Sequence, residues 1–215
     1  MKSYNPYTSM VHTNGHLICA VDVETTGLTP GYHDLIQIAV VPLDCNIKPI
    51  QTVLPFYMNM KPHYPEHIDK KLLRSGKVKI MNIINSGIDP DKAADLFDEW
   101  FMELNLPITQ NEHKRIMPLW TNGSFDKDFL REWLGRENYE SYFHFHERDT
   151  QVIGLFLNDR YDHHAEFKLP FSRVGLTNMC EELGVSNDMV HDALQDCLAT
   201  ADLYRALLTR FYIPS

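Results

Sequence analysis

Apolar residues from Leu17 to Val23 form the first regular run of the chain, which stops in a turn at Gly27 and Pro30. A short apolar run that ends in turn residues is typical of a buried strand. Two more strand-like runs follow, at residues 35–41 and 52–58. Because only turn residues separate these two runs, the pattern predicts a meander of three strands at the start of the fold.

Beyond residue 60 most apolar positions recur at helical spacing, and two further short apolar runs predict strands at 116–120 and 142–147. The predicted helices are 66–75, 91–104, one that begins after Asn122-Gly123, 150–158, 175–183 and 193–210. A meander followed by strands that alternate with helices predicts an α/β fold with a mixed five-stranded sheet and helices on its faces.

The length and composition indicate a single domain. At 215 residues with 44% hydrophobic and 23% charged residues, the chain is large enough to bury a full core. We therefore expect one domain over residues 1–215 with a short polar N-terminal extension, residues 1–15. This extension lacks the apolar run of a signal peptide, and no stretch is long enough to span a bilayer. The expected location is cytoplasmic, without membrane contact.

The cysteines Cys19, Cys45, Cys180 and Cys197 form no CxxC spacing. They are therefore predicted to be reduced thiols, and neither disulfides nor zinc ligands. The formal net charge of −9 argues against nucleic-acid binding by a broad basic surface. Because clustered metal-binding acids would themselves make the chain negative, charge leaves the substrate open.

Asp22 and Glu24 stand at the end of the first predicted strand. Side chains two apart on a strand point the same way, so these carboxylates are expected side by side. Two such charges repel unless one carboxyl is protonated or a hard divalent cation lies between them. The pair thus predicts a metal site, although a solvated acidic strand end remains the alternative.

Asp126 follows the fourth predicted strand by one short turn, at the start of a helix. From there its carboxylate can point back over the sheet. Asp128 is two residues further on, about 200° around the helix, and is expected in solvent. The alternative for Asp126 is an ordinary first-turn acid, stabilised by the helix dipole.

The segment His191-Asp192-Ala193-Leu194-Gln195-Asp196 predicts the start of the last helix, because Asp192 and Gln195 have the spacing of a capping box. His191 then lies on the preceding loop and can fold over a site that Asp196 enters from the first turns. The alternatives are a surface histidine and an exposed helical acid.

Three motifs together resemble those of one enzyme family. DVETTG at 22–27, NGSFD at 122–126 and HDALQD at 191–196 are similar to the motifs of the DEDDh 3′–5′ exonucleases, over residues from about 16 to 208. That superfamily includes the proofreading epsilon subunit of bacterial replicative DNA polymerase, oligoribonuclease, ribonuclease T and phage exonucleases. The resemblance implies a ribonuclease H-like fold.

The resemblance also assigns roles to the acids. Asp22, Glu24, Asp126 and Asp196 match the four carboxylates that hold two Mg²⁺ or Mn²⁺ ions, and His191 matches the family's histidine. Two such ions about 3.5–4 Å apart activate a water, stabilise the leaving oxygen and neutralise the phosphate. A histidine titrates near neutral pH, so His191 would be suited to act as the general base.

Further positions are implied by the same resemblance. Thr25 and Thr26 are expected at the 3′ end of the substrate, through hydroxyl and backbone N–H groups, and Leu28 beneath the last base. Asn122 is expected either to orient that pocket or to cap the helix. Asp149 is a candidate to support the metal ligands from behind.

The sequence therefore predicts a metal-dependent enzyme that releases nucleoside 5′-monophosphates from the 3′ ends of single-stranded DNA, with a polymerase or replication protein as a possible partner. The alternatives are a 3′–5′ exoribonuclease acting on short RNA, and a non-catalytic polymerase-associated binding module. The oligomeric state is left open. The chain also carries a basic cluster, which would either guide the substrate backbone or form a solvated helical face: Lys70, Lys71, Arg74, Lys77 and Lys79.

Overall fold

A central sheet organises the chain in a computed structural model that describes residues 11–109, 112–164, 169–187 and 191–210. Its strands are β1 Leu17–Thr25, β2 Leu35–Pro42, β3 Phe56–Asn59, β6 Ile116–Trp120 and β7 Arg148–Asp149. The strand order is β3-β2-β1-β6-β7. The β1–β2 and β2–β3 pairs are antiparallel, whereas β1–β6 and β6–β7 are parallel. The predicted mixed five-stranded sheet is confirmed.

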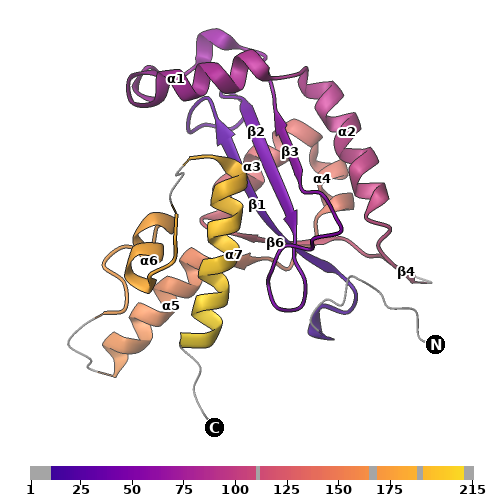
Figure 1. The fold of residues 1–215 in the computed structure, drawn as a ribbon. Helices are drawn as coiled ribbons and strands as arrows, with labels where there is room; N and C mark the ends of the chain where they lie inside the picture. The colour runs from indigo at the N-terminus through magenta and orange to yellow at the C-terminus, as the bar shows by residue number, and fades with distance from the viewer. Residues whose placement is uncertain (1–10, 110–111, 165–168, 188–190, 211–215) are drawn as a thin grey trace.

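Helices cover both faces of this sheet (Figure 1). They are α1 Lys70–Ser86, α2 Pro90–Glu103, α3 Gly123–Leu134, α4 Arg136–Tyr142, α5 Thr150–His163, α6 Leu176–Leu183 and α7 Ala193–Arg210, with short 3₁₀ turns at Val11–Thr13 and Pro65–His67. One face of the sheet packs against α7, and α2, α3 and α4 lie on the other face. The outer side of α7 carries α5 and α6.

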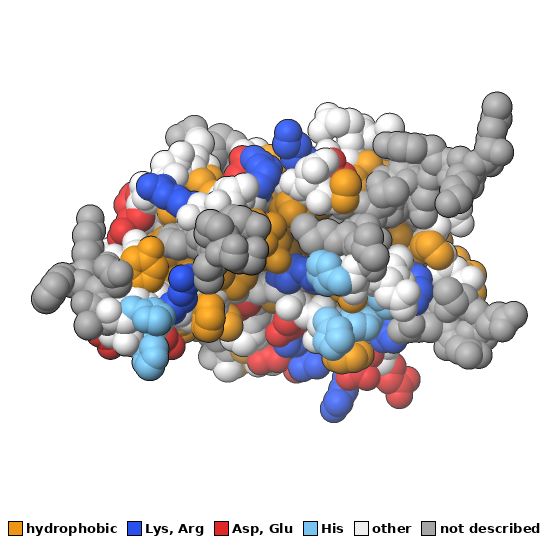
Figure 2. All heavy atoms as spheres, turned by 90° about the horizontal axis from the view of Figure 1, so that it is seen from below, with side chains coloured by type: hydrophobic (Ala, Val, Ile, Leu, Met, Phe, Trp, Pro, Cys, Tyr) orange, Lys and Arg blue, Asp and Glu red, His pale blue; other side chains and the backbone are white. Residues whose placement is uncertain are grey.

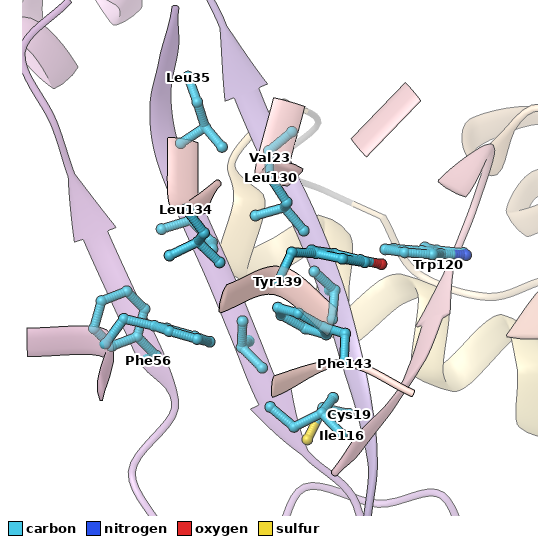
Figure 3. Close-up of a cluster of buried hydrophobic side chains, with 14 of the residues drawn as sticks. Cys19, Val23, Leu35, Phe56, Ile116, Trp120, Leu130, Leu134, Tyr139 and Phe143 are labelled. Atoms are coloured by element: carbon cyan, nitrogen blue, oxygen red, sulfur yellow. The ribbon is translucent and has the colours of Figure 1, made fainter. Parts of the chain in front are cut away.

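The central strand β1 serves both faces because its side chains alternate. Cys19 and Val23 point into the larger core, where Trp120, Leu130 and Phe143 also pack (Figure 3). The intervening residues of β1 pack against α7, where small residues allow the helix to approach the sheet closely: Ala20, Ala39, Ala193 and Ala201. The C-terminal end of β1 and the start of α7 therefore meet at the same edge of the sheet, near α1 (Figure 1).

The predictions for α2, α3 and α7 agree with the structure to within one or two residues. The four cysteines are free thiols; Cys45 is exposed and the other three are buried. Within the described residues, no helix is long and apolar enough to cross a membrane. Most of the predicted N-terminal extension, residues 1–10, lies outside the described residues, and the single-domain organisation stays a prediction.

The fifth strand was predicted in the wrong place. Residues 142–147 were expected to form it, but Tyr142 ends α4, and the strand that pairs with β6 is Arg148–Asp149. Tyr139 and Phe143 anchor the end of α4: they are four residues apart, and their rings stack with centroids 4.9 Å apart in the core. Phe143 follows α4 with an extended backbone and forms only an isolated bridge with Ile116, so the apolar run contains a helix end and one bridge residue in place of a continuous strand.

Other boundaries differ as well. The strand predicted at 52–58 is shorter, because only Phe56–Asn59 pairs with β2. The helix predicted at 66–75 begins later and is longer, since Asp69 caps α1 by accepting the N–H of Lys71. The predicted helix 150–158 extends to His163. A two-stranded sheet of β4 Ile108–Thr109 and β5 Glu112–His113 was not predicted.

Candidate active site

Two partly exposed acids lie at the end of β1, between buried neighbours. Asp22 and Glu24 are the two partly exposed positions of the strand, whereas Val21 and Val23 are buried. This alternation is the one the sequence predicted, and it directs both carboxylates to the same side. Because β1 is the central strand, its end lies over the middle of the sheet edge.

Asp126 reaches this strand from the first turn of α3. Its Oδ1 accepts the backbone N–H of Val23, the residue between Asp22 and Glu24, at 3.1 Å. The side chain is only 4% exposed, and burial raises the pKa of Asp126 to about 7, although the hydrogen bond from Val23 opposes the rise. A third carboxyl group is thus bound to the backbone of β1 between the two acids, in a place where its charge is disfavoured.

Asp128, in contrast to Asp126, is exposed to solvent. Its side chain is 60% exposed and lies 3.8 Å from the guanidinium of Arg131, on the outer face of α3. The prediction that these two acids of α3 point in different directions is confirmed by this geometry.

The start of α7 brings a fourth acid and a histidine to the same place. Asp196 is buried, and its Oδ2 accepts the backbone N–H of His191 at 2.9 Å. Glu24, His191 and Asp196 each offer one possible ligand atom, and these atoms lie within 4.8 Å of one another. Residues that are 167 positions apart in the chain are therefore neighbours at one point.

The thiol of Cys197 shows how closely the acids gather. Burial raises the pKa of this thiol well above its ordinary value, and the nearby charges of Asp22, Asp126 and Asp196 add to the rise. A pocket of about 320 Å³ opens beside them and is lined by Asp22, His191 and Asp196, among others. Two of the four predicted carboxylates, Asp22 and Asp196, thus line one accessible pocket together with His191.

This set of donors fits a hard divalent cation. Carboxylate oxygens from two elements approach the same point, and hard cations prefer such oxygen ligands. Burial raises the pKa of Asp126, and a cation beside this carboxyl would lower the pKa again by favouring the charged form. The residues that would hold the ions are Asp22, Glu24, Asp126 and Asp196.

Asp149 supports the site from behind, at the start of α5. Its Oδ1 accepts the N–H groups of Asn122, Gln151 and Val152, and its Oδ2 accepts that of Gly123. One carboxylate therefore caps α5 and also holds the segment that leads into α3. Because α3 carries Asp126, the position of that acid depends on this bond network.

Thr25 is the last residue of β1, and the loop that follows carries Thr26 and Leu28. Leu28 is 78% exposed, as expected for a side chain that would lie beneath a base. The Thr25 hydroxyl donates to the carbonyl of Gly27 at 2.6 Å. Thr26 is fully buried, and both its N–H and its hydroxyl pair with the backbone of Asp34. In this structure Thr26 therefore shapes the loop instead of offering a polar group to a ligand.

Asn122 occupies the cap position of α3, but its side chain makes no capping hydrogen bond. Its backbone is left-handed, with φ of 65°, and its side chain lines the pocket beside Asp22 and His191. Of the two roles expected for Asn122, the structure thus rules out side-chain capping.

The sequence reasoning missed Gln37 and Tyr57, which bond to the start of α7. A signal for Gln37 was present, because it is a polar residue inside the apolar run of β2 and is only 1% exposed. Such a buried amide needs hydrogen-bond partners. No comparable signal marked Tyr57, since aromatic residues are common in strands.

Comparison with known proteins agrees with the family resemblance of the three motifs. A family model described as exonuclease, RNase T, matches residues 19–204. Ribonuclease T of Wigglesworthia glossinidia brevipalpis is 27% identical over 199 residues, which are 89% of this chain and 84% of that protein.

Solved structures show the same fold. Exonuclease I superposes with a TM-score of 0.67 at 17% identity, over 90% of this chain. Cell-death related nuclease 4 superposes with a TM-score of 0.62 at 16% identity, over 97% of this chain and 67% of that one. This chain spans only 41% of the length of exonuclease I. The match establishes the ribonuclease H-like fold that the motifs implied.

Proposed function

Because this chain belongs to the exonuclease family and is a DEDDh-type 3′–5′ exonuclease, we propose that it removes nucleoside 5′-monophosphates one at a time from single-stranded DNA. The observation that carries the proposal is the convergence of Glu24, His191 and Asp196 within 4.8 Å, beside Asp22 and the buried Asp126. The family is metal-dependent, and we propose Mg²⁺ or Mn²⁺ as the two ions. Such ions supply an activated water, charge neutralisation at the phosphate and stabilisation of the leaving oxygen.

The four carboxylates have the task of holding these ions. Asp22 and Glu24 do so from a strand, and Asp126 and Asp196 from the first turns of two helices. Rigid elements of this kind keep ligand positions fixed more accurately than loops do. Asp126 gains a further constraint from the N–H of Val23.

His191 lies where it would accept a proton from the attacking water. It is exposed, its ring lies next to Glu24 and Asp196, and its backbone N–H is tied to Asp196. A ring nitrogen accepts a proton from the water that attacks the phosphorus, while the bond between phosphorus and the 3′-oxygen breaks. The released nucleotide therefore keeps its 5′-phosphate, and the leaving 3′-oxygen of the shortened strand takes a proton from solvent to become the new 3′-hydroxyl.

The terminal nucleotide would lie between the loop after β1 and the pocket of about 320 Å³. Leu28 offers an exposed apolar surface for the last base, and the side chain of Asn122 lies in the pocket wall. Thr25 would contact the 3′ end, whereas Thr26 would hold the loop in shape through Asp34.

Exposed basic side chains at the start of α1 are the candidates for guiding the substrate strand. The face opposite the site shows acidic, basic and histidine side chains mixed together (Figure 2). Lys70, Lys71 and Arg74 are exposed at the start of α1, near the site, and we propose that they guide the backbone of the strand. The side chains of Lys77 and Lys79 lie outside the described residues. A polymerase or replication partner stays a prediction.

Digestion of end-labelled single strands tests the proposal. Activity should require Mg²⁺ or Mn²⁺, stop in chelator, and be absent on a 3′-blocked strand and on a closed circle. Cleavage that continues in chelator, or that is equally fast on the circle, would contradict a metal-dependent attack from the 3′ end.

RNA is the second candidate substrate, because the relative at 27% identity is a ribonuclease T. The preference for DNA draws on exonuclease I, which was solved with dT13 and dA16 oligonucleotides. Matched DNA and RNA oligomers of the same sequence, digested under the same conditions, separate the two. A higher kcat/KM on RNA would assign the chain to the exoribonucleases.

A further inference from the structure

A polar network that is buried at Gln37 and exposed at Tyr57 joins the start of α7 to strands β2 and β3, and neither the motifs nor the family match gives it a role. We propose that Tyr57, on β3, is a positioning residue for His191, which it holds in place through Asp192 and together with Gln37. This inference rests on the proposed function, in which His191 is the general base.

The first link is a hydrogen bond across the sheet edge. The hydroxyl of Tyr57 donates to Oδ2 of Asp192 at 2.8 Å, and Asp192 directly follows His191. The other oxygen of the same carboxylate, Oδ1, accepts the N–H of Gln195 at 3.2 Å and so caps α7. Asp192 therefore fixes the start of the helix to β3 as well as closing its first turn.

Gln37 provides the second link, to the next residue. Its Oε1 accepts the N–H of Ala193 at 2.9 Å. Its Nε2 donates to the hydroxyl of Tyr57 at 3.0 Å and to Oδ1 of Asn59 at 2.7 Å. Both ends of this buried amide are thus used, so its orientation is determined, and Tyr57 and Ala193 are held by the same side chain.

The hydroxyl of Tyr57 is suited to this donor role. Burial raises the pKa of Tyr57 to about 12, and the hydrogen bond to Asp192 and the charge of Glu24 act in the same direction. The hydroxyl accordingly keeps its proton at neutral pH. It accepts from Gln37 and donates to Asp192, which makes the chain of bonds directional.

His191 needs such support because of its backbone. Its φ is 69°, in the left-handed region, which costs roughly 1–2 kcal/mol for a residue with a side chain. Its own N–H is bonded to Asp196, and the next two residues are fixed by Tyr57 and Gln37. The network therefore sets the direction from which the histidine ring enters the site.

Tyr57→Phe removes one hydroxyl and tests the proposal, with Tyr142→Phe as the matched control. Tyr142 also donates to a carboxylate, Oδ1 of Asp98 at 2.8 Å, but it lies on α4, away from α7. We expect Tyr57→Phe to lower kcat about tenfold, as for one hydrogen bond to a charged group, while KM and the calorimetric affinity for Mn²⁺ stay within about twofold. Tyr142→Phe should match the wild type in all three.

The same substitution in a His191→Ala background separates positioning from a general loss of structure. If Tyr57 acts through His191, Tyr57→Phe should have no further effect on kcat once the histidine is absent. An equal loss in both backgrounds, an unchanged kcat in the single variant, or a weakened Mn²⁺ affinity would overturn the positioning role alone. An active His191→Ala variant would instead overturn the proposed base, and the inference with it.

Discussion

Asp126 and Asp128 are the same residue type, two positions apart on α3, in opposite surroundings. Asp126 is buried against β1, and Asp128 is in solvent beside Arg131. We predict that Asp126→Asn lowers kcat roughly 10²-fold or more, because an amide cannot replace a charged ligand. Asp128→Asn should stay within about twofold of the wild type. Steady-state kinetics on one DNA oligomer measures both, and the reverse order of effects would show that Asp128 is the ligand.

The buried carboxyl of Asp126 should make the free energy of unfolding depend on pH when no metal is bound. Its pKa is about 7 in the folded protein and about 4 in an unfolded chain. Between these values the unfolded state loses its proton first, so rising pH favours unfolding, by at most about 1.4 kcal/mol per pH unit.

The substitution Asp126→Asn removes this titration but keeps an oxygen for the N–H of Val23. In chelator, the variant should therefore gain stability relative to the wild type as the pH rises from 5 to 7. Urea unfolding at both pH values measures the difference. A constant difference between the two proteins would mean that Asp126 titrates normally in the fold.

At the scale of the element, Asp149 decides where α3 begins. It accepts N–H groups from two segments, whereas Asp89 caps α2 alone by accepting the N–H groups of Asp91 and Lys92. An N-cap is typically worth about 1 kcal/mol. We predict that Asp149→Ala lowers the free energy of unfolding by roughly 2–3 kcal/mol, which is more than the effect of Asp89→Ala.

The kcat values of Asp149→Ala and Asp89→Ala should differ as well. Asp149→Ala releases the segment that places Asp126, so its kcat should fall even where the protein is fully folded, whereas Asp89→Ala should keep the wild-type kcat. Urea unfolding and kinetics on the same preparations test both statements. Equal effects of the two substitutions would reduce Asp149 to an ordinary helix cap.

At the scale of the whole molecule, the proposed metal site would connect elements that are distant in the chain. β1, α3 and α7 each contribute acids, so an ion that binds only the folded state should stabilise the whole domain. At a concentration of 100 times Kd the gain is about 2.7 kcal/mol. We predict that Mn²⁺ raises Tm by several degrees in the wild type.

Two variants show whether the increase in Tm comes from binding at the proposed ligands. Asp196→Ala removes a proposed ligand and should lose most of the shift, whereas His191→Ala removes the proposed base and should keep it. Differential scanning calorimetry with and without Mn²⁺ provides the measurement. A shift that disappears in His191→Ala as well would make the histidine a ligand, which its distance from Glu24 and Asp196 also allows.

Much of this protein is determined by local sequence. The alternation around Asp22 and Glu24 placed two acids on one side of β1, and the spacing of Asp192 and Gln195 placed the start of α7 correctly. Both patterns depend on the geometry of a single element, so the residues within it are sufficient. The three motifs then indicated the family, because together they are specific in type, spacing and order.

The tertiary structure alone decided what meets at the site and how it is held. The bond from Val23 to Asp126 joins residues 103 positions apart, and that from Tyr57 to Asp192 joins residues 135 apart. Such pairs depend on the register of the strands and on how the helices pack, which no local pattern contains. The same is true of the fifth strand, since Phe143 forms only an isolated bridge with Ile116 and the pairing with β6 that makes the strand falls at Arg148–Asp149.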